Sequence, residues 1–166
     1  DEFDVSGKEW SASALYQKCL RITPNFIRVD ADELTYPLHV ILRYRLEQSL
    51  LSGELSIKDL PAAWNDMFMK SFGFRPTNDS DGCLQDIHWY DGAFGYFPTY
   101  TLGAMAAAQL FSAALEDEPK ILTKLEKGDF SDLLDWLREH VHSWGSYYST
   151  DEIIKRATGL SLDPSF

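Results

Sequence analysis

A long run of apolar residues at helical spacing constrains the fold of this chain more than any other feature. Between residues 30 and 51 the apolar side chains recur every three or four positions, at Leu34, Leu38, Ile41, Leu42, Leu46 and Leu50. This spacing places them on one stripe of an α-helix, which is expected to lie against other helices. Pro37 lies in or just after the first turn, where it either opens the helix or kinks it. No segment alternates apolar and polar residues cleanly, so we predict an all-α fold.

Glycine and proline residues divide the rest of the chain into shorter helical segments. Helices are predicted over residues 11–21, from an N-cap in residues 56–59 to Phe72, and over residues 96–115, 121–126, 130–141 and 150–158. Residues 84–89 are predicted to form either a short strand or an extended strip, with Asp86 and His88 on the same side. The sequence contains no internal repeat or linker, so residues 1–166 are expected to form one unit or part of one.

Composition and charge exclude several classes of function. With 166 residues, of which 45% are hydrophobic, the chain is long enough for one soluble domain with a core. The net charge of −11 argues against nucleic acid and anionic membranes as partners, and no apolar run is long enough to span a bilayer. Cys19 and Cys83 do not make a disulfide framework, so a reducing compartment is expected. Because the chain begins with Asp1 instead of Met, we expect it to be a piece of a longer polypeptide.

Residues 82–103 contain the side chains best suited to chemistry. The segment contains four glycines, of which Gly82, Gly92 and Gly95 allow the backbone to turn sharply or to approach a ligand closely. His88 can donate, accept or carry a proton near neutral pH. Tyr96 and Tyr100 offer hydroxyl groups and, being four residues apart, share one face of the predicted helix. We therefore predict that this segment forms the wall of an active site.

Three blocks of the sequence point to one family. They are Ile-Arg-Val-Asp-Ala-Asp-Glu at residues 27–33, Gly-Cys-Leu-Gln-Asp-Ile-His-Trp at 82–89, and Gly-Tyr-Phe-Pro-Thr-Tyr-Thr-Leu-Gly at 95–103. Together they resemble signature blocks of the thermostable carboxypeptidase family, which are HExxH zinc carboxypeptidases with a largely helical fold. The resemblance implies that residues 1–166 are the C-terminal part of the catalytic domain of a zinc-dependent metallocarboxypeptidase. Such an enzyme removes single residues from peptides with a free C-terminus, uses zinc or cobalt, and is homodimeric and cytoplasmic.

The resemblance also implies roles for four residues. Arg28 would bind the terminal carboxylate of the substrate, because a guanidinium group pairs with a carboxylate through two parallel hydrogen bonds. The alternative for Arg28 is a structural ion pair with Asp30 or Asp32. His88 would contact the substrate near the scissile bond, with Asp86 orienting its imidazole, although a lone histidine beside a tryptophan is more often structural.

The same implication extends to two tyrosines of the third block. Tyr96 and Tyr100 would donate hydrogen bonds to the tetrahedral intermediate or to the substrate carboxylate. Ordinary helix packing is the alternative for each of them, and the sequence does not distinguish which one acts in catalysis.

No zinc site is expected within the chain itself. A catalytic zinc needs three protein ligands, two of which an HExxH helix supplies, and no HExxH occurs here. His140 and His142 are two residues apart and point to different sides of a helix, and His39 has Arg43 one turn away. The resemblance implies that the zinc ligands lie upstream of Asp1, in a missing N-terminal part of the same enzyme, so the chain alone is expected to be inactive.

The rival hypothesis is a non-catalytic, acidic helical module that binds a protein partner. A large exposed apolar surface would favour the piece of an enzyme over that module.

Overall fold

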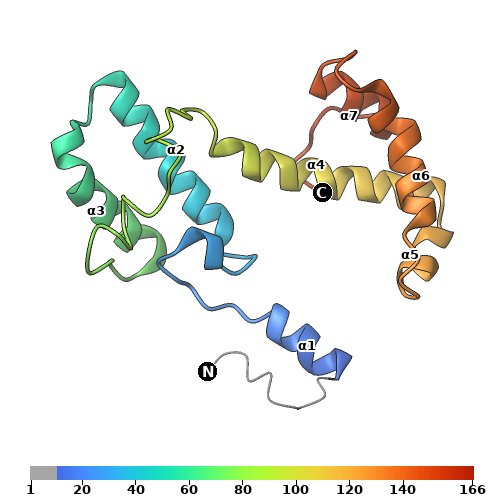
Figure 1. Cartoon of the computed structure of the whole chain (residues 1–166), viewed down its shortest axis with the longest axis horizontal. Coiled ribbons are helices and arrows are strands. Elements are labelled where there is room, and N and C mark those ends of the chain that lie inside the picture. The colour runs from blue at the N-terminus through green and yellow to red at the C-terminus, as the bar shows by residue number, and fades with distance from the viewer. Residues whose placement is uncertain (1–10) are drawn as a thin grey trace. The chain divides into compact units, whose positions relative to one another are not determined.

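The structure is a computed structural model that describes residues 11–166 (Figure 1). Its α-helices are α1 Ala12–Cys19, α2 Tyr36–Ser52, α3 Leu60–Phe72, α4 Pro98–Asp117, α5 Lys120–Leu125, α6 Ser131–His140 and α7 Thr150–Thr158. Three short 3₁₀ turns, η1 Arg28–Asp30, η2 Ile57–Asp59 and η3 His142–Trp144, complete the regular structure. The described residues contain no strand, so the predicted all-α fold is confirmed and the strand option for residues 84–89 is wrong. Turns and bends take its place there, because backbone N–H groups such as those of Leu84 and Gln85 donate to carbonyls a few residues earlier in the chain and not to a neighbouring strand.

The described chain divides into two compact units, one ending at Pro98 and the other running from Thr99 to Phe166. The prediction that residues 1–166 form one unit of a larger catalytic domain stays a prediction. Within the described range, no helix combines the length and the apolar character that crossing a membrane requires.

The first unit has its core between α2 and α3, which pack against each other (Figure 1). The core residues, all buried, are Leu42, Leu46, Leu60, Trp64, Phe68 and Cys83. Helix α3 ends where Gly73 adopts a left-handed conformation with φ +83°, in agreement with the predicted stop.

Helix α2 differs from the prediction at its start and on its buried face. The helix was predicted to begin at about residue 30, but it begins at Tyr36, after η1, and Pro37 opens it, which was one of the two predicted roles of this proline. Asp32 explains the late start, because its carboxylate accepts hydrogen bonds from the backbone N–H groups of Thr23 and Thr35 and so stabilises the turn before the helix.

The predicted apolar stripe of α2 is only partly buried. Leu42 and Leu46 lie in the core, but Leu34, Leu38 and Ile41 are exposed. Apart from Val40, the other buried residues of the helix are polar, and they are His39, Arg43 and Glu47, which are spaced four residues apart. Helix α2 therefore buries ionisable side chains, and these side chains belong to the candidate site described in the next subsection.

The second unit has a smaller core made of Ala114, Ile121, Trp136 and Ala157, and α6 packs against α5 and α7. Helix α7 spans its predicted range and begins with a capping box between Ser149 and Glu152. Helix α4 begins at Pro98, two residues later than predicted, since proline suits the first turn of a helix. Tyr96 therefore precedes the helix, and the expectation that it shares a helical face with Tyr100 is wrong.

Candidate functional site

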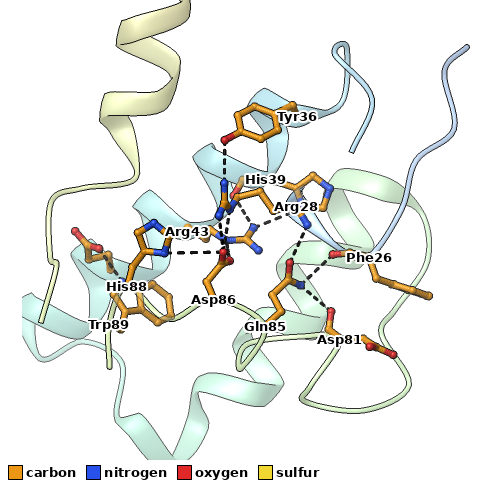
Figure 2. Close-up of polar contacts among 11 residues, drawn as sticks. Phe26, Arg28, Tyr36, His39, Arg43, Asp81, Gln85, Asp86, His88 and Trp89 are labelled. Atoms are coloured by element: carbon orange, nitrogen blue, oxygen red, sulfur yellow. Dashed lines mark hydrogen bonds and ion pairs between the residues drawn. The ribbon is translucent and has the colours of Figure 1, made fainter. Parts of the chain in front are cut away.

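The centre of the candidate site is Asp86, on which two arginines converge (Figure 2). Arg28 donates from Nε and Nη2 to Asp86 Oδ1, at 3.0 and 2.7 Å. Arg43 donates from Nε to Asp86 Oδ2 at 2.5 Å. The side chains of Arg28, Arg43 and Asp86 are 7%, 1% and 11% exposed, so the cluster is almost entirely shielded from water.

Neighbouring residues fix the direction of both guanidinium groups. Arg28 Nη1 donates to the hydroxyl of Tyr36 at 2.9 Å, and Arg43 Nη1 donates to the carbonyl of His39 at 2.9 Å. The Arg43 guanidinium also lies 4.7 Å from the ring centre of Trp64, in a cation–π contact. Each arginine is thus held by Asp86 and by at least one further group.

Gln85 ties the two sequence blocks of the site together. Its Oε1 accepts a hydrogen bond from the backbone N–H of Arg28 at 2.8 Å. Its Nε2 donates to the carbonyls of Phe26 and Asp81, at 3.0 and 2.8 Å. The strip that precedes α2 and the loop that follows α3 therefore meet at Gln85 and Asp86 (Figure 2).

The cluster carries a net positive charge. Burial alone would raise the pKa of Asp86, but the hydrogen bonds and charges of Arg28 and Arg43 outweigh this effect and keep the pKa below its usual value. Burial and the charge of Arg28 lower the pKa of Arg43 to about 10, which still leaves it protonated at neutral pH. Burial and the two arginines lower the pKa of His39 to about 4, so this histidine is neutral. Two cations and one anion give these three side chains together a net positive charge.

His88 and Tyr96 lie next to each other in the same unit. The centres of their rings are 5.4 Å apart, and the ring centre of His88 is 4.4 Å from that of the buried Phe97. His88 Nδ1 lies 3.9 Å from Asp86 Oδ1, which is an electrostatic contact and too long for a hydrogen bond. His88 thus lies beside Asp86, as predicted from the sequence, but turns at residues 87–90 bring the two together and not the predicted extended strip.

Glu47 connects the two ends of the loop that lies between His88 and Tyr96. Its Oε2 accepts a hydrogen bond from Trp89 Nε1 at 2.7 Å, and its Oε1 accepts one from the backbone N–H of Gly95 at 2.5 Å. Gly92 and Gly95 have φ values of +73° and +77°, which glycine adopts at little cost.

The structure brings together three of the four residues singled out in the sequence. Arg28, His88 and Tyr96 lie in the first unit, around or near Asp86, whereas Tyr100 lies on α4 in the second unit. The structural ion pair considered for Arg28 exists, but with Asp86 in place of Asp30 or Asp32.

Sequence reasoning missed Arg43, Glu47, Tyr36 and Gln85 as contributors. The spacing of His39, Arg43 and Glu47 was the available signal, because three polar residues four apart share the helix face that also buries Leu42 and Leu46. A charged row beside an apolar stripe indicates buried partners from elsewhere in the chain.

The described residues do not fit a catalytic metal site by themselves. In residues 11–166 no three His, Cys, Asp or Glu side chains come together in a way that would hold a metal ion. Asp86 is engaged by two arginines and Glu47 by two N–H groups. A zinc ion with three protein ligands therefore has no place among these side chains alone.

Comparison with known proteins agrees with this architecture. Residues 1–166 match the family model described as carboxypeptidase Taq (M32) metallopeptidase. Carboxypeptidase 1 of Bacillus subtilis is 50% identical over 140 residues, which are 84% of this chain and 28% of the relative. The solved structure of Pyrococcus furiosus carboxypeptidase superposes with a TM-score of 0.90 at 41% identity, over 95% of this chain and 32% of that one. Trypanosoma cruzi metallocarboxypeptidase 1 gives a TM-score of 0.88 at 42% identity, over 93% of this chain and 33% of the other.

These matches define a class of helical metallocarboxypeptidases. The chain belongs to the carboxypeptidase Taq (M32) metallopeptidase family, which confirms the family resemblance of the three sequence blocks. It spans 28% and 29% of the length of the curated relatives from Bacillus subtilis and Pyrococcus furiosus.

Proposed function

We propose that this chain forms the substrate-carboxylate pocket of a metal-dependent carboxypeptidase, as the C-terminal part of a longer enzyme. The observation that carries the proposal is the pair of buried arginines that share the carboxylate of Asp86, because these three side chains together carry a net positive charge. A carboxypeptidase must recognise the terminal carboxylate of its substrate, and a fixed guanidinium group is suited to that task. Membership of the metallopeptidase family supports the choice of this anion over others.

Arg28 is the residue that we assign to the carboxylate. Asp86 and Tyr36 hold its guanidinium group on different sides, so little reorganisation is needed when a substrate arrives. Its burial strengthens an interaction with an anion, because water screens charges weakly in such a place. Arg43 is the more deeply buried of the two arginines and supports the positive potential from behind Asp86.

His88, Tyr96 and Tyr100 are the residues that we assign to the reacting part of the substrate. The imidazole of His88 would bond to the substrate backbone near the scissile bond. The hydroxyl groups of Tyr96 and Tyr100 would donate to the oxygen that becomes negative in the tetrahedral intermediate. The ring contact between His88 and Tyr96 supports a shared role for these two residues.

The ligands of the catalytic metal would be supplied by the rest of the enzyme. We propose zinc or cobalt, bound by residues outside those described, and we expect the chain alone to be inactive. A homodimer in the cytoplasm is also part of the proposal. The cytoplasmic location is supported by Cys19 and Cys83, which are both free thiols and fit a reducing compartment.

Exposed apolar surface supports the proposal that further polypeptide packs on this chain. Of the 20 residues of α4 only Gln109 and Ala114 are buried, and Leu102 and Phe111 are among its exposed side chains. A protein-binding module would also expose such a surface, so the preference for the enzyme rests on the buried arginine pair and on the family match.

A chimaeric enzyme tests the proposal. The matching segment of Bacillus subtilis carboxypeptidase 1, which is 50% identical, would be replaced by this chain. The chimaera is expected to release the last residue of a blocked dipeptide in the presence of zinc or cobalt and to leave the C-terminal amide of that peptide intact. A folded chimaera that binds metal but hydrolyses neither peptide, or both equally, would overturn the proposal.

A further inference from the structure

The carboxylate of Glu47 bonds to both ends of the loop that separates His88 from Tyr96. One donor is the indole of Trp89, the residue after His88, and the other is the backbone N–H of Gly95, the residue before Tyr96. His88 and Tyr96 are therefore each next in sequence to a residue that donates a hydrogen bond to the carboxylate of Glu47. We propose that Glu47 is a positioning residue that sets the separation of His88 and Tyr96. The role in catalysis rests on the function proposed above.

The chemistry of the contact requires a carboxylate. Glu47 is only 3% exposed, and within residues 11–166 it makes no ion pair, so its charge is stabilised by the two N–H donors. Hydrogen bonds to an ionised acceptor are roughly twice as strong as neutral ones. Glutamine would have nearly the same shape, but its amide nitrogen would face one of the two donors. A glutamine can therefore hold one end of the loop and must repel the other.

Backbone hydrogen bonds within the loop limit how far it can change its shape. The backbone N–H of Asp91 donates to the carbonyl of Ile87 at 3.0 Å, and that of Ala93 donates to the carbonyl of His88 at 2.8 Å. The positive φ of Gly95 directs its N–H toward α2, from which Glu47 projects. With both ends fixed on one rigid helix, the ring centres of His88 and Tyr96 are kept 5.4 Å apart.

A spectroscopic experiment on the complete chain tests the structural half of the proposal. The nuclear Overhauser effect between ring protons of His88 and Tyr96 reports their separation, and hydrogen exchange reports the protection of the Gly95 amide. In Glu47→Gln we expect the Overhauser effect to fall at least about twofold and one of the two donors, Gly95 N–H or Trp89 Nε1–H, to exchange about tenfold faster or more. Trp89→Phe removes one donor but keeps an aromatic ring, and it should weaken the Overhauser effect as well.

The matched control is Leu46→Ala. Leu46 lies next to Glu47 on α2 and is 2% exposed, but it belongs to the apolar core. Its truncation costs about 2–5 kcal/mol of stability, while the His88–Tyr96 contact should persist. An unchanged Overhauser effect in folded Glu47→Gln contradicts the proposal. If that variant does not fold, an unchanged effect in Trp89→Phe contradicts it equally.

Kinetics of the chimaeric enzyme test the catalytic half. Because Arg28 keeps its contacts, Glu47→Gln should lower kcat by about tenfold to 100-fold and change KM by less than about twofold. Leu46→Ala should change neither value by more than about twofold. A normal kcat in Glu47→Gln, despite a lost ring contact, would show that the separation is not used in the reaction. An inactive parental chimaera would instead count against the proposed function and would leave the spectroscopic result standing.

Discussion

Replacing Asp86 by asparagine should strongly destabilise the first unit. The substitution keeps the shape of the side chain but removes the negative charge that Arg28 and Arg43 share. The two arginine side chains, 7% and 1% exposed, would then be buried without the carboxylate that they share. Removing one partner of a buried ion pair costs about 3–5 kcal/mol. Because two cations depend on this carboxylate, we expect about 4 kcal/mol or more.

Urea unfolding followed by far-UV circular dichroism measures this loss. With a denaturant slope of about 2 kcal/mol per molar, a loss of about 4 kcal/mol lowers the midpoint by about 2 M. The matched control is Asp66→Asn, which breaks the pair between Asp66 and Arg75, whose side chains are 62% and 53% exposed. An exposed pair contributes less than about 1 kcal/mol, so its midpoint should move by less than about 0.5 M.

A second substitution separates the charge effect from other causes. Adding Arg43→Met to Asp86→Asn removes one of the cations that lost its partner, so the double variant should recover about 1 kcal/mol or more. The reasoning is refuted if Asp86→Asn unfolds within about 0.5 M of the unmodified chain, or if the double variant is less stable than Asp86→Asn alone.

Three further predictions concern other contacts. His39→Phe should flatten the dependence of stability on pH between pH 6.5 and 4. The folded-state pKa of His39, about 4, lies below the ordinary 6.5, so protonation of this histidine in the unfolded chain lowers the stability of the unmodified protein by up to about 3 kcal/mol as the pH falls through this window. Urea midpoints of the variant and of the unmodified chain, measured at each pH, check this difference. Gly73→Ala should cost about 1 kcal/mol in a urea titration, because the φ of +83° disfavours a side chain although no atom lies within 4 Å of the added Cβ, and an unchanged midpoint would contradict this. Gln109→Leu should lower stability by about 2–3 kcal/mol in thermal unfolding, because the buried amide bonds to Thr158, Leu160, Ser161 and Asp163, and a loss below about 0.5 kcal/mol would show that water replaces these bonds.

Helix positions were largely predictable because their signals are local. Gly73 and the Ser149–Glu152 capping box act within one turn of the chain, and the predicted ends of α3 and α7 agree with the structure. The start of α2 was missed, since the bonds from Asp32 to Thr23 and Thr35 depend on a turn that periodicity does not reveal.

The candidate site was predictable only in its most distinctive residues. The blocks around Arg28 and His88 identified two of its segments, but the partner of Arg28 lies 58 residues away, at Asp86. Glu47 was missed for the same reason, because its partners Trp89 and Gly95 are 42 and 48 residues distant. Contacts over such separations follow from tertiary packing and have no spacing rule that a single sequence displays.

The assignment of Arg28 to the substrate carboxylate is tested most directly by the kcat/KM of Arg28→Met in the chimaeric carboxypeptidase, with circular dichroism to verify folding. Loss of a charge-assisted hydrogen-bonded pair predicts that kcat/KM for a peptide with a free C-terminus falls about 100-fold or more. Hydrolysis of the same peptide as its C-terminal amide should stay at its low level, so the preference for the free carboxylate should collapse. An unchanged kcat/KM in folded Arg28→Met would contradict the assignment and leave the Arg28–Asp86 pair a structural one.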